Sequence, residues 1–312
     1  MTSIGLSFLL STGCRLRIVL FAALASVATA ITAQDKPLQV TDDNGIQVSL
    51  DSPARRIVSL APSLTEMLFA VGAGDQLVGV VEYSDYPAEA ALLPVIGRHD
   101  LLDLEAIIAL QPDLIVSWKT GNPAAAVDRL KQLGLTVYVA EPRELQSIPR
   151  HLEKLSVLTG TSETGNRIAA NFDRSLQALR SQYQEGPRVR VFYQVWDAPL
   201  ITAGGNELIN DMISLCGGEN LFADLTQVAP KVTVEAVLNR GPEVIIASGM
   251  DLARPEWLDR WQDWPQLPAV TGGHLYFIPP DLVQRHTPRA LEGATRMCEQ
   301  IDRVRQDQVV PG

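Results

Sequence analysis

The sequence predicts an α/β protein with two Rossmann-like lobes joined by one long α-helix, and with a ligand cleft between the lobes. Three observations lead to this prediction. A segment occurs twice, once on each side of a helical region: a short helix opening with Glu, a turn of Pro and an acidic residue, and an apolar strand. The helical region itself, residues 144–186, has no strand pattern. Elsewhere short apolar strands alternate with helices, which is typical of a parallel, doubly wound sheet.

The repeated segment has its first copy at residues 104–117 and its second at residues 234–248. Each strand in it is apolar at almost every position, as expected of a strand that is buried on both faces. A single match of this kind is common in α/β proteins. Its repetition on both sides of a long helix is what favours duplicated lobes over one large domain.

Residues 1–33 are interpreted as a cleaved signal peptide. Arg15 and Arg17 precede an apolar run at residues 18–25, and small residues follow it. The run is too short to span a bilayer as a helix. An uncleaved anchor is the alternative, and both interpretations predict an exported protein.

The first lobe is expected at residues 55–143, after a small hairpin with Asp43-Asn44-Gly45 at its turn. A helix is expected after its first strand, with Ser63 or Thr65 as the N-cap and Gly72 just beyond its end. The four strands predicted in this lobe span residues 56–60, 77–81, 114–117 and 136–139.

The linking segment at residues 144–186 contains the long helix, which is expected from Ser162 to Glu185. Ser162 is the predicted N-cap, and Gly186-Pro187 is the stop signal. Apolar residues recur in this helix at steps of three and four, which places them on one face. The residues of this face are Ile168, Phe172, Leu176, Leu179 and Tyr183.

The second lobe is expected at residues 187–306 and repeats the scheme of the first. One helix is expected between Gly204-Gly205 and Cys216, and the last helix opens at Pro288 after a loop at residues 281–287. The strands predicted in this lobe span residues 190–195, 244–247 and 275–278.

The chain is acidic, with 26 basic and 36 acidic residues and a formal net charge of −10. The first 33 residues contain only basic charges, so their removal makes the protein more acidic still. Nucleic acid is therefore not an expected partner, because its binding requires a basic surface. An acidic surface suits basic protein partners instead.

The cysteines of the expected mature chain are Cys216 and Cys298. An even pair in an exported protein indicates a disulfide, with two buried thiols as the alternative.

An enzymatic function finds little support in the sequence. The chain has no GxSxG, GxxxxGK, CxxC or HExxH motif. Its four histidines are scattered, so neither a metal site nor a catalytic group follows from their spacing. A binding protein is therefore favoured over an enzyme in the cleft, which stays open as the alternative. The histidines are His99, His151, His274 and His286.

Aromatic and charged side chains follow several predicted strands. Tyr83 and Trp118 follow strands of the first lobe, while Trp196, Asp281 and Arg285 follow strands of the second. Ligands of doubly wound sheets bind outside the carboxyl ends of the strands. Two facing edges would bring these side chains into one cleft suited to a large, partly flat and partly polar ligand. For each aromatic taken singly, packing in the core or at its rim is the alternative.

Six stretches of the chain together carry a resemblance to a known family. They are Arg56-Ile57-Val58-Ser59-Leu60-Ala61-Pro62-Ser63 through Glu66, Tyr83-Ser84-Asp85-Tyr86-Pro87, the Glu105 helix with Pro112-Asp113-Leu114, Trp118 with Gly121-Asn122, Cys216-Gly217-Gly218-Glu219-Asn220, and Asp281 with Pro288-Arg289. These stretches resemble the periplasmic cobalamin-binding proteins of ABC importers, within the wider class of iron-siderophore, haem and cobalamin solute-binding proteins. The resemblance extends over about residues 55–305.

The resemblance implies a periplasmic carrier that binds cobalamin or a related corrinoid and delivers it to an inner-membrane ABC permease. Cobalamin is then the transported ligand, and no cofactor or metal is implied. Glu105 and Glu235 would be the two docking carboxylates for the permease, one in each lobe, and Cys216 and Cys298 would form the disulfide of the family. The residues implied in ligand contact are Tyr83, Trp118, Asp281, Leu282, Val283, Gln284 and Arg285.

The chain departs from this family at three positions where cobalamin binders carry aromatic residues. His99, Ala229 and Ile201 stand there instead. The same carrier role for haem or a ferric siderophore is therefore the alternative. His99 at a ligand-facing position would also be able to contact a metal centre in the ligand.

Overall fold

The computed structural model describes residues 37–309, and the predicted signal peptide at residues 1–33 lies outside them. Contacts group the described residues into one compact unit, so the predicted lobe limits at residues 55–143, 144–186 and 187–306 stay a prediction. Between residues 37 and 309, no helix combines the length and apolar character that a membrane span needs.

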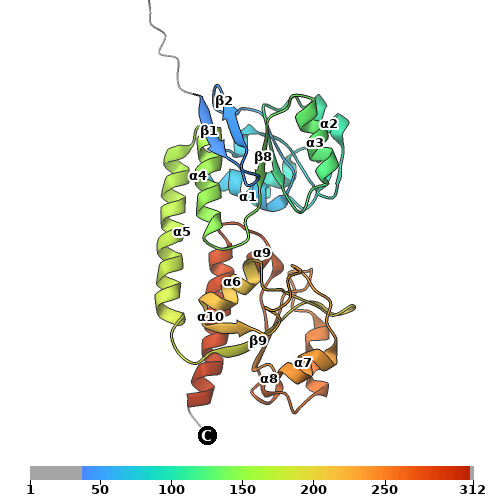
Figure 1. Cartoon of the computed structure of the whole chain (residues 1–312), viewed down its shortest axis with the longest axis vertical. Coiled ribbons are helices and arrows are strands. Elements are labelled where there is room, and N and C mark those ends of the chain that lie inside the picture. Colours follow the sequence, from blue (N-terminus) through green and yellow to red (C-terminus); the bar gives the residue numbers. More distant parts are fainter. Residues whose placement is uncertain (1–36, 310–312) are drawn as a thin grey trace, which may run out of the picture. The chain divides into compact units, whose positions relative to one another are not determined.

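The first part of this unit, here called the N-lobe, is built on a four-stranded parallel sheet (Figure 1). A small antiparallel hairpin precedes it, as predicted, and a second, two-residue hairpin follows β4. The sheet has the order β4 (Leu77–Val80), β3 (Ile57–Ser59), β7 (Leu114–Trp118) and β8 (Val137–Ala140), and the hairpins are β1 (Leu38–Thr41) with β2 (Gln47–Leu50) and β5 (Gly97–Arg98) with β6 (Leu101–Leu102). The helices of the N-lobe are α1 (Pro62–Ala70), α2 (Leu104–Ala109) and α3 (Ala124–Gln132), with 3-10 turns at Gly74–Gln76 and Ala88–Leu92.

The second part, the C-lobe, is built on a five-stranded sheet that is parallel except for one short strand. Its strand order is β10 (Ile201–Thr202), β9 (Val189–Trp196), β12 (Val244–Ala247) and β13 (Leu275–Phe277), with β11 (Gly218–Asn220) also paired to β9. Its helices are α6 (Leu208–Leu215), α7 (Val234–Arg240), α8 (Pro268–Thr271), α9 (Pro280–Val283) and α10 (Ala290–Val309), with a 3-10 helix at Glu256–Asp263. The antiparallel β10 was not predicted from the sequence, because two residues are too few to give a strand pattern.

The repeated sequence segment has the same role in both lobes. In the N-lobe, the Asp113 carboxylate accepts the backbone N–H of Arg56 at 3.0 Å, just before β3. In the C-lobe, the Glu243 carboxylate accepts the backbone N–H of Arg190 in β9 at 2.7 Å. In each case the acidic residue of the Pro-acid turn joins its own strand to the neighbouring parallel strand. The prediction of duplicated lobes is therefore confirmed, and the two lobes share even this hydrogen bond between side chain and backbone.

Strand residues alternate between two faces, and both faces of each sheet are covered. In β7, Val116 packs in one core cluster and Ile115 in another. In β9, Tyr193 packs in the first of these clusters and Phe192 in a third. The continuous apolar runs of these strands are explained by this burial on both sides.

The linking segment contains two helices, and the long one extends from the N-lobe to the C-lobe, as predicted. α4 (Ser147–Thr159) and α5 (Ser162–Tyr183) pack against each other, and Gly160 between them has the positive φ of a helix C-cap (Figure 1). The apolar face predicted for the long helix is confirmed, because Phe172 and Leu176 are buried in the large core cluster. The predicted Ser162 cap is wrong: Ser162 is the first helical residue.

The N-cap predicted for α1 is also wrong. Ala61 occupies the N-cap position and Pro62 begins the helix, because the fixed φ of proline suits the first helical residue. The Thr65 hydroxyl instead donates to Ser59 at 2.9 Å and to the carbonyl of Ala61 at 3.2 Å.

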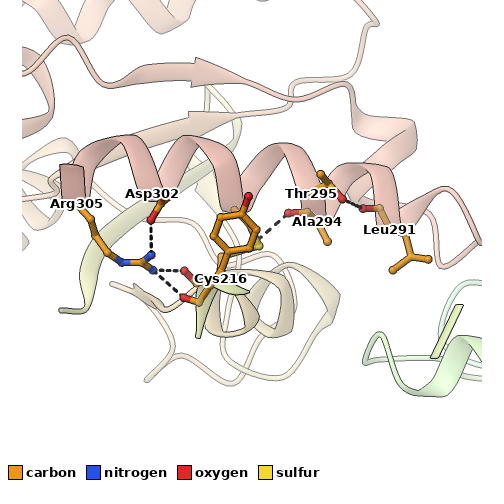
Figure 2. Close-up of a disulfide and its surroundings, with 8 residues drawn as sticks. Cys216, Leu291, Ala294, Thr295, Asp302 and Arg305 are labelled. Atoms are coloured by element: carbon orange, nitrogen blue, oxygen red, sulfur yellow. Dashed lines mark hydrogen bonds and ion pairs between the residues drawn. A yellow bond between two sulfur atoms is a disulfide. The ribbon is translucent and has the colours of Figure 1, made fainter. Parts of the chain in front are cut away.

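A disulfide between Cys216 and Cys298 joins the end of α6 to α10, which confirms the predicted pair (Figure 2). The buried guanidinium of Arg305 on α10 reinforces this junction. It donates to the carbonyl of Cys216, to that of Tyr183 at the end of α5 at 3.1 Å, and to Asp302 at 2.9 Å. The last helix therefore ties the long linking helix α5 to the C-lobe. The disulfide joins two cysteines that lie 82 positions apart in the sequence.

Candidate ligand-binding site

Tyr83 lies in the loop that follows β4, at the carboxyl edge of the N-lobe sheet. Its side chain is 71% exposed, and its φ of 65° is in the left-handed region that a tyrosine rarely adopts. Exposed aromatic groups on strained backbone are frequent at ligand sites. The position predicted for Tyr83 at the mouth of a site therefore agrees with its local geometry.

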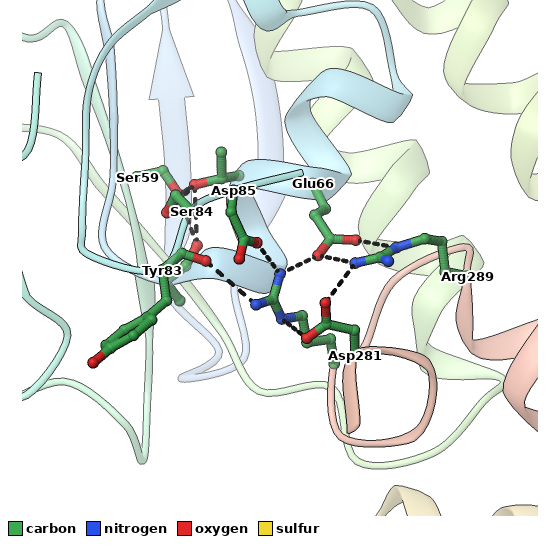
Figure 3. Close-up of polar contacts among 10 residues, drawn as sticks. Ser59, Glu66, Tyr83, Ser84, Asp85, Asp281 and Arg289 are labelled. Carbon is green, nitrogen blue, oxygen red and sulfur yellow. Dashed lines mark hydrogen bonds and ion pairs between the residues drawn. The ribbon is translucent and has the colours of Figure 1, made fainter. Parts of the chain in front are cut away.

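Hydroxyl groups fix the loop of Tyr83 to the body of the N-lobe. The Ser84 hydroxyl lies 3.2 Å from that of Thr65 on α1, and Thr65 in turn bonds Ser59 at the end of β3 (Figure 3). All three side chains are buried, so their hydrogen bonds are protected from competition with water. The loop is thereby a fixed platform for Tyr83.

Trp118 is the last residue of β7, and the turn after it holds the indole in place. A Cβ atom at Gly121 would lie only 1.7 Å from the indole ring, so only glycine allows this packing. The Asn122 side chain accepts from the backbone N–H of Trp118 at 2.6 Å and donates to the carbonyls of Leu60 and His99 at 2.8 Å. These contacts explain why glycine and asparagine follow Trp118 in the sequence.

His99 is brought next to Trp118 by the same asparagine. The two ring centroids lie 6.1 Å apart with the ring planes tilted by 36°. Among the residues that the structure describes, no group of three or more His, Cys, Asp or Glu side chains is arranged to hold a metal ion. His99 can therefore contribute one aromatic and basic group beside Trp118, but the protein itself offers no metal centre there.

A buried carboxylate joins the N-lobe to the C-lobe. Glu66 on α1 is 2% exposed and accepts hydrogen bonds from two arginines between α9 and α10 (Figure 3). Arg285 donates to it at 2.7 Å, and Arg289 donates to both of its oxygens at 2.9 and 2.7 Å. A buried carboxylate with two guanidinium partners has its charge compensated, which is what makes its burial tolerable.

Arg285 has further partners in both lobes. It pairs with Asp85 at 2.8 Å and with Asp281 at 3.1 Å, and it donates to the carbonyl of Tyr83 at 3.3 Å. Burial lowers the pKa of Arg285, but the hydrogen bonds that it donates to Asp85 and Glu66 outweigh this effect and raise the pKa above its ordinary value. Arg285 and Asp281, both predicted to contact the ligand, are thus engaged with each other and with the loop of Tyr83.

Arg289 completes this ion cluster, defined as Glu66, Asp85, Asp281, Arg285 and Arg289. Its guanidinium lies over the Tyr86 ring, 3.8 Å from the ring centroid, in a cation–π contact. Tyr86 belongs to the same loop as Tyr83. The cluster therefore fixes the aromatic loop of the N-lobe against the C-lobe.

The remaining residues of the predicted ligand loop pack mainly within the C-lobe, and Leu282 also lines a cavity beside the ion cluster. Leu282 and Val283 are buried in the large core cluster, and Asp281–Val283 belongs to the helical turn α9 rather than to a loop. Gln284 donates to the Ser248 hydroxyl at 2.7 Å and to the carbonyl of Gly249 at 3.3 Å. In this structure Leu282 and Val283 support the site by packing, and Gln284 supports it through the loop after β12.

A cavity of about 480 Å³ lies beside the ion cluster and is lined from both lobes. Asp85 and Tyr86 line it from the N-lobe, and Asp281 and Arg289 line it from the C-lobe. Leu252, an exposed residue of the loop after β12, forms another part of its wall. The cavity combines aromatic, aliphatic and charged surface, which suits a partly apolar ligand with polar groups at its edge.

The two glutamates predicted to dock a permease occupy equivalent positions. Glu105 and Glu235 are each the second residue of a short helix, α2 and α7, and both are exposed. Asp103 caps the first helix at 3.0 Å and Thr233 caps the second at 3.2 Å. The backbone N–H of Glu235 itself and the Thr233 hydroxyl hold the pKa of Glu235 below its usual range, so it is charged at neutral pH.

Sequence reasoning did not assign Glu66, Asp85 or Arg289 to the site. Their partners lie about 200 positions away in the sequence, and no local pattern records such a contact. One signal was present: Glu66 stands inside the apolar sequence of α1, next to Met67 and Leu68. A charged residue in such a setting is almost always paired.

The chain is similar to known proteins over most of its length. The model of a family described as "Periplasmic binding protein" matches residues 57–282. Vitamin B12-binding proteins of Vibrio parahaemolyticus and Vibrio cholerae are 36% and 39% identical to it, over 82% and 79% of this chain and 92% and 88% of their own.

Solved structures give the same result. The crystal structure of the periplasmic vitamin B12 binding protein BtuF of Vibrio cholerae is 37% identical, with a TM-score of 0.75 over 81% of this chain and 98% of that one. The haem-binding protein RhuT from Roseiflexus is 23% identical, with a TM-score of 0.71 over 80% and 99% of the two chains, and this likeness concerns the fold alone.

Proposed function

The chain belongs to the periplasmic binding protein family. We propose that it captures cobalamin or a related corrinoid and delivers it to an inner-membrane ABC permease. Its membership makes it a solute-binding protein of the periplasm and not an enzyme. What such a protein holds is the transported ligand rather than a cofactor. Export through a cleaved signal peptide at residues 1–33 is part of the same proposal.

The observation that carries the proposal is the similarity to vitamin B12-binding proteins at 36–39% identity over about four fifths of the chain. The geometry of the site supports it. Tyr83 and Trp118 stand on fixed loops at the carboxyl edge of the N-lobe sheet, where ligands of such sheets bind. We assign both aromatic side chains to contact with the corrin ring.

Asp281 and Arg285 have a different role in this proposal. Because their charges are already paired within the ion cluster, they present the polar edge of a preformed site instead of free charges. A site held in its binding geometry loses less freedom when the ligand arrives. Leu282, Val283 and Gln284 support this edge from behind.

Delivery requires a surface that the permease can recognise. We propose that Glu105 and Glu235, one on each lobe, pair with basic residues of the permease. Their equivalent exposure at the starts of α2 and α7 supports this assignment. Acidic residues are also favoured there by the helix dipole, so docking requires its own test.

The second candidate is the same carrier role for haem or a ferric siderophore. The observation that favours it is His99, whose ring lies beside Trp118 where cobalamin binders carry an aromatic residue. Imidazole is a common ligand of haem iron. Binding of the ligand that is unchanged in His99→Ala would contradict a metal contact through this residue.

The direct test is a calorimetric titration of the purified mature protein with cyanocobalamin. We expect saturable one-to-one binding, and we expect Tyr83→Ala and Trp118→Ala each to weaken it about tenfold, since truncation of a buried aromatic anchor typically costs more than 1 kcal/mol. Trp264→Ala, in the C-lobe core cluster away from these loops, serves as the control.

Three outcomes separate the candidates. Binding that both loop variants weaken supports the corrinoid and the site together. Binding that neither variant weakens supports the ligand but contradicts the assigned residues. An absence of binding to cyanocobalamin, with saturable binding of haemin or of a ferric siderophore, transfers the carrier role to the second candidate.

A further inference from the structure

The loop at residues 249–254, which follows β12, exposes two large apolar side chains. Met250 and Leu252 are each 67% exposed. Two aliphatic side chains in a six-residue loop, displayed to water, do nothing for the stability of the C-lobe. Exposed apolar groups of this kind mark surfaces that contact something else.

The base of this loop is anchored to the candidate site. Gln284, which follows α9, donates to the Ser248 hydroxyl at 2.7 Å and to the carbonyl of Gly249 at 3.3 Å. Gly249 turns the chain with a φ of 70°. At the other end of the loop, Arg254 pairs with Asp259 through two hydrogen bonds of 2.8 and 2.6 Å. Both ends are held, and the apolar side chains lie between them.

The loop faces the N-lobe across the cavity described above. Leu252 lines this cavity from the C-lobe, and Tyr86 lines it from the N-lobe. Tyr86 is also exposed, so one aromatic side chain of the N-lobe and one aliphatic side chain of the C-lobe share this cavity. Asp281 and Arg289 of the ion cluster line the same cavity.

We propose that Met250 and Leu252 form an apolar wall of the ligand site on the side of the C-lobe and help to determine which ligand it accepts. This inference rests on the proposed function. A corrin ring has two largely apolar faces and a rim of amide groups, so its faces require apolar contact from both lobes. On the C-lobe side of the cavity, Leu252 supplies aliphatic surface, and Met250, two positions before it in the same loop, is equally exposed. Methionine adapts its shape to irregular surfaces, which suits a puckered macrocycle.

The test compares cyanocobalamin binding by three double variants in calorimetric titrations. Met250→Ser with Leu252→Ser removes the apolar surface, and we expect it to raise Kd at least fivefold, as the loss of about 40–60 Å² of apolar contact predicts. Met250→Leu with Leu252→Met keeps that surface, and we expect a Kd within about twofold of the wild type. Ile108→Ser with Leu133→Ser removes exposed apolar groups at the ends of α2 and α3, at the sheet edge opposite the ligand site, and serves as the control.

A second measurement locates the contact. Amide hydrogen exchange in residues 249–254 should slow when cyanocobalamin is added, while exchange in the turn at residues 133–136, which enters β8 at the opposite edge of the sheet, should not change. Wild-type binding that the serine variant retains in full, without slower exchange in the loop, overturns the inference and leaves the proposed function intact. A wild-type protein that does not bind cyanocobalamin contradicts the inference together with the proposed function.

Discussion

Glu66 is the residue on which the junction of the two lobes depends most. Its carboxylate is buried and pairs with Arg285 and Arg289, which are more than 200 positions away in the sequence. Loss of this buried charge weakens the hydrogen bonds of both arginines, and the more exposed Asp85 and Asp281 compensate their charges only in part. We therefore expect Glu66→Gln to lower the free energy of unfolding by about 3 kcal/mol in urea titrations.

The matched control for Glu66 is an ion pair exposed to water. Asp100 pairs with Arg98 at 2.5 Å, and both side chains are about half exposed. Solvent screening makes such a pair weak, so Asp100→Asn should change the free energy of unfolding far less than Glu66→Gln does. Equal effects of the two substitutions would mean that the buried cluster does not hold the lobes together.

Among single residues, the positions of the site side chains could be predicted from the sequence, but their interaction partners could not. Tyr83 and Trp118 could be predicted because both follow strands whose carboxyl ends form the edge where ligands bind. The pairing of Arg285 with Glu66 could not, since it depends on how two distant segments meet. The surroundings of Leu282 and Val283 could not be predicted for the same reason: both pack in the core, and Leu282 also lines the cavity, so their ligand contact stays a prediction.

At the scale of elements, helix α6 begins with an ionisable cap. Glu207 accepts the backbone N–H groups of Ile209 and Asn210 at 2.9 and 3.2 Å through one carboxylate oxygen. Its side chain retains some solvent contact, but protein surrounds most of the carboxyl group. This burial raises the pKa of Glu207 to about 8, and the two backbone hydrogen bonds only partly offset it.

The raised pKa of Glu207 predicts a pH dependence with a definite sign. The folded protein holds this proton more tightly than the unfolded chain, so the contribution to stability is complete below about pH 4.5 and is lost as the pH rises through about 8. The loss amounts to at most roughly 5 kcal/mol. Glu207→Gln keeps the two acceptor contacts without a charge, so its stability should not show this loss between pH 5 and pH 9.

Urea titrations at pH 5, 7 and 9 check this prediction, with the difference between wild type and variant as the quantity of interest. Glu163→Gln, in the exposed first turn of α5, should follow the wild-type pH dependence. A Glu207→Gln protein that loses as much stability as the wild type would show that Glu207 is ionised throughout this range.

Element boundaries show why part of the fold could be predicted and part could not. The face of α5 could be read from its period, because burial on one side imposes steps of three and four. The caps of α1 and α5 were predicted wrongly, because several Ser and Thr residues compete for each position and tertiary contacts decide between them. Thr65, for example, lies within α1, and its hydroxyl bonds Ser59 and Ser84 instead of capping the helix.

At the scale of the whole molecule, the duplication places one carboxylate at the same point of each lobe. Glu105 and Glu235 follow equivalent caps, and the residue two positions after each, Ile107 and Val237, is fully buried in its own lobe. Each glutamate is therefore fixed to a rigid helix rather than to a mobile loop. A permease that contacts both lobes at once would bind the carrier more tightly than through either contact alone.

The docking proposal predicts an additive loss of affinity for the permease. Glu105→Lys and Glu235→Lys should each weaken binding of the carrier to the permease reconstituted in nanodiscs about tenfold, because each replaces an attraction with a repulsion. Since the two sites belong to different lobes and share no partner, the double variant should lose about a hundredfold. Affinity for cyanocobalamin should stay unchanged in all three, which separates docking from ligand capture.

Glu163→Lys reverses an exposed first-turn charge on α5 and should bind the permease as the wild type does. Equal binding by Glu163→Lys and the double variant would mean that these carboxylates serve only as helix-capping charges.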